Sequence, residues 1–181
     1  MAGQSLPRSY RLPASRTIKP YQQGDLDGLC GIYSLINAIR LVQIAAGTVR
    51  TGECEALFSF AMHRLAERGD LRERLSTGVP WAELKRVGRR MAKVVYHHGQ
   101  ELSLCPVARG PADRINTIKK HLVAGRPIVA SVQTDQHYTV IVGWTPTRAL
   151  TFDSSAGHWV QLEPIRRALC LAISASGTSV P

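Results

Sequence analysis

The chain has 181 residues, 44% of them hydrophobic, which is enough for one soluble domain with its own hydrophobic core. Its formal net charge of +10 favours an acidic partner, substrate or surface. The basic residues are scattered along the sequence without a nucleic-acid-binding motif, which argues against nucleic acid as the partner. No apolar run approaches the roughly 18 residues of a membrane-spanning helix, so no membrane span is expected.

Residues 1–20 are predicted to be an extended lead-in, and residues 21–181 a single domain. The first half of that domain predicts helices, because apolar residues recur at helical spacing and glycines follow as stop signals. These helices are expected over residues 28–46, 53–68, 80–94 and 112–124, with a loop over 71–78. Short strands are expected at 94–96 and 102–107.

From residue 127 onward the pattern changes to short, β-branched runs separated by turn residues. Strands are expected over residues 128–132, 138–144, 149–152, 158–162 and 169–173. Helices that precede an antiparallel sheet, without an alternating βα repeat, are typical of the α+β class.

The four cysteines are Cys30, Cys54, Cys105 and Cys170, and no two of them form a CxxC pair. A structural zinc site is therefore not expected, and the His97-His98 pair has no third ligand at a suitable spacing. Residues 1–21 lack the apolar centre of a secretory signal. We expect synthesis in a reducing cytosol with free thiols, with later delivery by a signal-independent route left open.

Cys30 is the candidate nucleophile because it follows a turn-prone acidic stretch and opens an apolar helical pattern. The helix N-terminus stabilises a thiolate, which is the reactive form of cysteine. A free cysteine beside an apolar run is more often a small buried hydrophobe, so the partners of Cys30 decide between the two interpretations.

His137 begins one predicted strand and Asp153 ends the next, and in a hairpin these two positions face each other. A carboxylate that binds one ring nitrogen fixes the tautomer and raises the basicity of the other nitrogen, which could then take the proton of Cys30. Taken singly, His137 could be a structural strand-end histidine and Asp153 a turn residue.

The order Cys30, His137, Asp153, with the cysteine on a helix and the other two on a following sheet, resembles papain-like cysteine proteases. Two segments carry the resemblance, residues 27–38 around the cysteine and residues 137–154 around the histidine. The second segment is most similar to the double-glycine leader peptidases of bacteriocin exporters, and papain-like toxins passed between bacteria look similar as well. The resemblance implies a papain-like fold, with the nucleophile helix packed on a C-terminal antiparallel sheet.

The same resemblance implies an oxyanion-hole glutamine a few residues before the cysteine. Gln23 is favoured for this role, with Gln22 and the side chain of Asp27 as alternatives. Gly28 and Gly31, on either side of Cys30, are expected to bind substrate.

Trp144 is a further candidate for substrate binding, in a groove that Trp159 would help to line. Both tryptophans would more commonly belong to the core.

The resulting hypothesis is a cysteine peptidase that hydrolyses a peptide bond through a thioester, without metal or organic cofactor. The resemblance implies cleavage after small residues such as Gly-Gly, and favours a bacterial effector toxin that a separate acidic inhibitor restrains. The alternatives are an acyltransferase or deamidase that uses the same triad, a leader-peptide maturation peptidase, and an inactive domain that only binds peptides.

Overall fold

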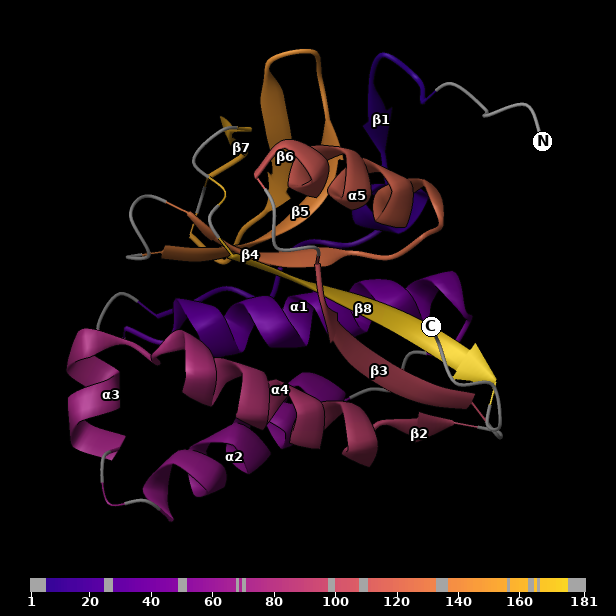
Figure 1. Cartoon of the computed structure of the whole chain (residues 1–181). Coiled ribbons are helices and arrows are strands. Elements are labelled where there is room, and N and C mark those ends of the chain that lie inside the picture. The colour runs from indigo at the N-terminus through magenta and orange to yellow at the C-terminus, as the bar shows by residue number, and fades with distance from the viewer. Residues whose placement is uncertain are drawn as a thin grey trace.

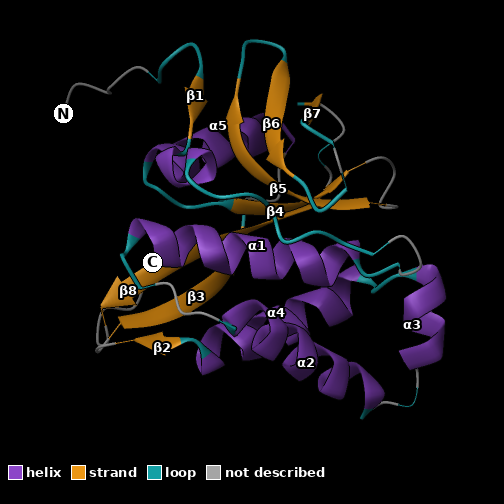
Figure 2. Cartoon of the chain, turned by 180° about the vertical axis from the view of Figure 1, so that it is seen from behind, coloured by secondary structure: helices purple, strands orange, loops and turns teal. Residues whose placement is uncertain are grey.

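The computed structural model describes residues 6–24, 28–48, 52–67, 69, 71–97, 100–107, 111–132, 137–155, 157–162, 165 and 167–175. Helices α1, α2 and α4 pack together on one side of a curved sheet, and α5 covers β4 and β5 from the other side (Figure 1). The view from behind shows α1 lying between the sheet and the helices α2 and α4 (Figure 2). The α+β class that the sequence predicts is confirmed, with the Cys30 helix packed on the antiparallel sheet.

The helices are α1 (Cys30–Ala45), α2 (Glu53–Ala66), α3 (Leu71–Thr77), α4 (Trp81–Val94) and α5 (Pro111–Val123), with a short 3-10 helix η1 (Pro13–Arg16). Helix α1 is buried around most of its circumference, because the sheet covers one side while α2, α4 and η1 cover the rest. A helix enclosed in this way requires a nearly continuous apolar surface, which explains why α1 is more hydrophobic than α2, α4 and α5.

The predicted loop over residues 71–78 is wrong, because most of it forms helix α3. This helix buries none of its residues, so it has no apolar stripe from which periodicity could identify it. Its leucines, arginines and glutamate are good helix formers, and Arg74 ties it to α4 through a 2.9 Å ion pair with Glu83. Gly78 then ends the segment with a φ of 84°, a conformation that glycine adopts without strain.

The described strands form one antiparallel sheet in the order β2-β3-β8-β4-β5-β6-β7, with β1 added on β5. They are β1 (Tyr10–Arg11), β2 (Tyr96–His97), β3 (Gln100–Pro106), β4 (Ile128–Val132), β5 (His137–Trp144), β6 (Arg148–Phe152), β7 (Trp159–Gln161) and β8 (Arg167–Ala175). Every strand predicted beyond residue 127 is present, and β8 is longer than predicted because it pairs with β4 at its start and with β3 from Leu169 to its end. The sheet thus joins the helical half of the chain to the strand half.

Part of the expected N-terminal lead-in is built into the domain. Strand β1 pairs with β5, and Leu12 is only 3% exposed. A side chain at Gly143 would collide with the backbone of Tyr10 and Arg11, so this glycine permits the close approach of β1. Among the described residues, no helix combines the length and apolar character needed to cross a membrane.

Candidate active site

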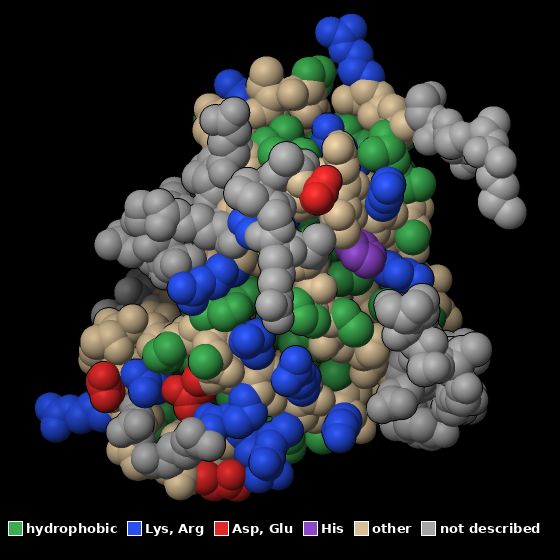
Figure 3. All heavy atoms as spheres, viewed as in Figure 1, with side chains coloured by type: hydrophobic (Ala, Val, Ile, Leu, Met, Phe, Trp, Pro, Cys, Tyr) green, Lys and Arg blue, Asp and Glu red, His purple; other side chains and the backbone are tan. Residues whose placement is uncertain are grey.

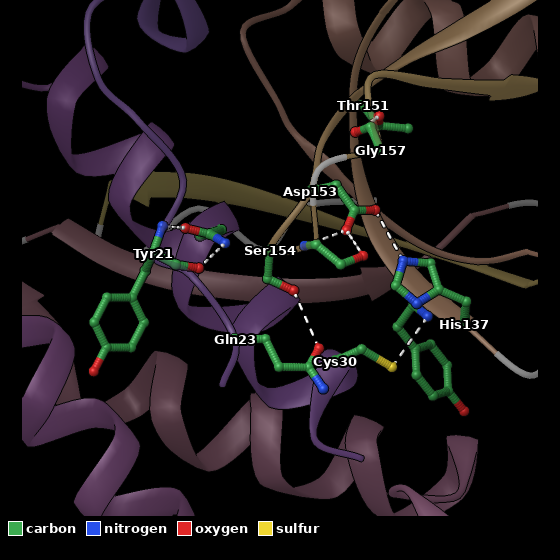
Figure 4. Close-up of polar contacts among 11 residues, drawn as sticks. Tyr21, Gln23, Cys30, His137, Thr151, Asp153, Ser154 and Gly157 are labelled. Atoms are coloured by element: carbon green, nitrogen blue, oxygen red, sulfur yellow. Dashed lines mark hydrogen bonds and ion pairs between the residues drawn. The ribbon is translucent and has the colours of Figure 1, made fainter. Parts of the chain in front are cut away.

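Cys30 is the first residue of α1, at the end of the helix where backbone N–H groups lack intrahelical acceptors. Its side chain faces β5, and its sulfur accepts a hydrogen bond from the backbone N–H of Tyr138 at 3.4 Å (Figure 4). Both this bond and the helix terminus favour negative charge on the sulfur. The sequence-based position of Cys30 in the first turn of a buried helix is therefore confirmed.

His137 is the first residue of β5, and Asp153 directly follows the last residue of β6. The antiparallel pairing of these two strands brings the residues together, with His137 Nε2 2.9 Å from Asp153 Oδ2. The other oxygen, Asp153 Oδ1, accepts hydrogen bonds from the N–H and the hydroxyl of Ser155, both at 2.8 Å. Both carboxylate oxygens are thus engaged, which fixes the carboxylate in front of the imidazole.

The pKa of His137 is raised to about 10. The largest cause is the hydrogen bond from its ring to Asp153, the second is the hydrogen bond to Cys30, and both act against the lowering effect of burial. The bond to Asp153 uses Nε2, so Nδ1 is the ring nitrogen that faces the sulfur. For Asp153, burial favours a higher pKa but is outweighed by hydrogen bonds from His137 and Ser155, and the pKa of the carboxyl is lowered. At neutral pH the site therefore holds an imidazolium between a carboxylate and a sulfur.

Gln23 is connected to the loop that carries Asp153. Its backbone N–H donates to the carbonyl of Ser154 at 3.1 Å, and its Oε1 accepts a long hydrogen bond from Ser154 Oγ at 3.5 Å (Figure 4). Gln22 is exposed, and its side chain donates instead to the carbonyl of Pro20. Asp27, the third candidate for the oxyanion hole, lies outside the described residues. Gln23 is thus the glutamine that the structure links to the site.

Asn37 holds the chain segment that leads to Gln23. Its Oδ1 accepts from the N–H of Tyr21 at 2.6 Å, and its Nδ2 donates to the carbonyl of the same residue at 3.1 Å. The Asn37 side chain is fully buried on α1, two turns after Cys30. Sequence reasoning assigned it no role, although a polar residue within an otherwise apolar helical stripe is a signal for such a contact.

The two predicted substrate-binding glycines lie in packing contacts around Cys30. A side chain at Gly31 would press into Leu84 of α4 and Tyr138 of β5, so this glycine lets α1 approach both elements. A side chain at Gly28 would meet the backbone of Gly78, and the Gly28 N–H donates to the carbonyl of Leu75 at 2.7 Å. These contacts account for both glycines through packing.

The prediction that Trp144 lines a substrate groove is corrected by the structure. Trp144 is 1% exposed, because β1 covers it. Its ring packs against Tyr10 at 5.3 Å, and its Nε1 donates to the carbonyl of Pro7. Another tryptophan, Trp81 at the start of α4, stacks on the ring of Tyr138, the residue after His137, at 6.0 Å. Trp159, by contrast, is exposed and lies under the guanidinium of Arg148.

The remaining cysteines lie in different environments. Burial raises the pKa of Cys170 to about 12 and also raises the pKa of Cys54. Cys105 lies opposite Cys170 in the register of β3 and β8, and both are free thiols. A thiol with a raised pKa is largely protonated at neutral pH, so neither Cys54 nor Cys170 has the environment of a nucleophile.

Within the described ranges, no three His, Cys, Asp or Glu side chains lie close enough together to hold a metal ion. His98 lies outside the described residues, so the expected absence of a metal site stays a prediction.

No protein-family model matches the chain, and no curated protein matches it. One similar solved structure is a double-glycine motif protease from an AMS/PCAT transporter in complex with the leader peptide. The two share 15% identity with a TM-score of 0.42, over 87% of this chain and 94% of the other. A similarity this low carries no functional argument, so the geometry around Cys30 must carry the proposal.

The four cysteines should differ sharply in reactivity toward iodoacetamide. At neutral pH we expect Cys30 to be alkylated first, and Cys170 only after unfolding, because the imidazolium of His137 stabilises the Cys30 thiolate. His137→Ala should slow Cys30 labelling, because the variant lacks the imidazolium that faces the sulfur. Peptide mass spectrometry after timed labelling measures this, and equal labelling of all cysteines would contradict it.

Proposed function

We propose that the protein is a cysteine peptidase that hydrolyses a peptide bond through a covalent thioester. The observation that carries the proposal is the continuous contact from the Cys30 sulfur through the His137 ring to the Asp153 carboxylate. A nucleophile, a proton carrier and an orienting carboxylate in this sequence of contacts are the parts that acyl transfer requires.

In the first step, the Cys30 thiolate attacks the carbonyl carbon of the substrate and forms a C–S bond. The carbonyl oxygen takes the negative charge of the resulting tetrahedral intermediate. When this intermediate collapses, the C–N bond breaks and the His137 imidazolium gives its proton to the departing amine. The raised pKa of His137 supports this role, because the ring still carries a proton at neutral pH.

In the second step, neutral His137 takes a proton from water while the water oxygen attacks the thioester carbon. The C–S bond then breaks, the product leaves as a carboxylic acid, and the thiolate and imidazolium are restored. Asp153 keeps the ring oriented throughout, because its hydrogen bond holds Nε2 and directs Nδ1 toward Cys30.

Two donors are proposed for the oxyanion, the backbone N–H of Cys30 and the side-chain amide of Gln23. The first is available because the first N–H groups of a helix have no acceptor inside it. Support for the second comes from Ser154, whose hydroxyl contacts the carbonyl end of the Gln23 amide and so directs the NH₂ end away from the Asp153 loop. One such donor typically lowers the barrier by about 2.7–4 kcal/mol.

We further propose that cleavage follows a small residue such as Gly or Ala. The packing at the start of α1 supports this, because Gly31, the residue after Cys30, is covered by Leu84 and by the Tyr138 ring, on which Trp81 stacks. Close packing of this kind beside the nucleophile leaves little room for a large side chain next to the reacting carbonyl.

The function is tested by exposing a proteome to the wild type and to Cys30→Ala and mapping new N-termini. We expect Cys30→Ala and His137→Ala to reduce cleavage to background. Asp153→Asn should keep about one to two orders of magnitude more activity than these two variants, because orienting the imidazole is less essential than proton transfer. Cys54→Ala is the matched control and should cleave like the wild type. Persistent cleavage by Cys30→Ala would refute the mechanism, and cuts after Arg or Phe would refute the proposed specificity.

Cleavage should be lost at high pH as the pKa of His137, about 10, is passed, because the proton for the leaving amine is then gone. The hydrogen bond to Asp153 is the largest cause of the raised pKa. In Asp153→Asn the alkaline limb of kcat/KM should therefore move down toward pH 6.5, the ordinary pKa of histidine. A pH profile of both proteins measures this, and an unmoved limb in Asp153→Asn would contradict the role given to the carboxylate.

Gln23→Ala should lower kcat by about 10²–10³-fold with little change in KM, as expected when one oxyanion donor is lost. Asn37→Ala should lower kcat less, through misplacement of the segment that carries Gln23, and should add nothing in the Gln23→Ala background. Gln22→Ala is the control and should leave kcat unchanged. If Asn37→Ala lowers kcat by the same factor in the Gln23→Ala background as in the wild type, then Asn37 does not act through Gln23 and contributes to stability alone.

A further inference from the structure

Helix α4 presents a cluster of basic residues on its outward-facing surface. Lys85, Arg89, Arg90 and Lys93 lie on one side of the helix, within an arc of about 140° at 3.6 residues per turn, with Lys85 half-exposed and the other three exposed. Figure 3 shows lysines and arginines crowded over the lower part of this face of the molecule, where α4 lies. We call these four residues the basic face of α4.

The basic face has no counter-charge of its own. The only acidic residue of α4 is Glu83, and its two oxygens are taken by Arg74 at 2.9 Å and Arg86 at 2.7 Å. None of the four cations forms an ion pair within the described part of the chain. Like charges three and four residues apart repel each other and destabilise a helix. The arrangement therefore works against folding and has no compensation within these residues.

The basic face also begins next to the candidate active site. Trp81, in the first turn of α4, stacks on Tyr138, whose N–H donates to the sulfur of Cys30. Lys85 follows one helical turn later, and the face extends from there to Lys93 over about 12 Å at 1.5 Å per residue. An extended peptide covers that distance with about four residues.

We propose that the basic face of α4 is a docking surface for an acidic segment of the substrate polypeptide, close in sequence to the bond that is cut. This inference rests on the proposed function, because it takes the polypeptide that enters the site to be the one that continues along α4. Charge complementarity supplies the recognition, with glutamate or aspartate side chains of the substrate opposite the four cations. Such contacts would select substrates through KM, leaving the chemistry at Cys30 unchanged.

The experiment measures binding and not cleavage. The probes are dye-labelled peptides in which glutamates stand before or after a Gly-Gly sequence, and matched peptides in which glutamines replace the glutamates. Fluorescence anisotropy is recorded with the full chain carrying Cys30→Ala, which prevents turnover, at low and at high salt. We expect at least one glutamate peptide to bind about tenfold more tightly than its glutamine match at low salt, and the difference to shrink at high salt.

Two variants with the same change in net charge locate the effect. Arg89→Glu with Arg90→Glu reverses charge on the basic face, whereas Arg16→Glu with Lys120→Glu reverses charge at exposed residues of η1 and α5. The first pair should abolish the preference for the glutamate peptide, and the second should preserve it. Circular dichroism of both variants shows that the chain remains folded.

Several outcomes would overturn the proposal. These are equal binding of the glutamate and glutamine peptides, equal loss in both charge-reversed variants, and displacement of the peptide by duplex DNA at a concentration below that of unlabelled glutamate peptide. Failure of the proposed function is visible separately, as unselective alkylation of the wild-type cysteines. Iodoacetamide labelling of Cys30 should proceed at the same rate in the Arg89→Glu, Arg90→Glu variant of the wild-type chain, because this small neutral reagent does not use the docking surface.

Discussion

The hydrogen bond between His137 Nε2 and Asp153 Oδ2 joins two charged groups that are largely removed from water, with 23% and 4% of their side chains exposed. Burial of a lone carboxylate is costly, so the site depends on both partners and on the two Ser155 donors at Oδ1. The β5–β6 hairpin provides this arrangement by placing the start of one strand beside the end of the next. Helix α1, packed across β5, then brings Cys30 to the free side of the ring.

These long-range relations were accessible from the sequence because each depends on a local pattern. Two β-branched runs separated by a turn define a hairpin, and the hairpin fixes which ends meet, so His137 and Asp153 could be paired without any knowledge of the fold. The apolar period after Cys30 likewise identified α1. The helix-first, strand-later order was sufficient for the α+β class, because no alternating βα pattern competed with it.

The features that sequence reasoning could not determine are of two kinds. Some depend on tertiary contacts, and helix α3 has no buried side chains that would produce a periodic apolar pattern. Helix α3 has no buried face, so its helical character comes from propensity and from contacts such as Arg74 with Glu83. Trp144 was placed in a groove because nothing in the sequence indicates that β1 would cover it. Sequence reasoning favoured Gln23 but kept Gln22 as an alternative, because the contact that separates them, between Gln23 and Ser154, spans more than a hundred residues of sequence.

The same helix, α1, supplies the candidate nucleophile and fixes the geometry of the segment before it. Cys30 and Asn37 are separated by two helical turns, so they project toward the same side of the helix. At one end Asn37 binds both backbone groups of Tyr21, and at the other end the N–H of Gln23 binds Ser154. Gln23 is therefore held between the nucleophile helix and the loop that carries Asp153. A shift of the hairpin relative to α1 would move His137 and Asp153 away from Cys30 and pull on the Gln23 segment, which is bound to both sides. The packing of α1 against β5 therefore maintains the geometry of the whole site.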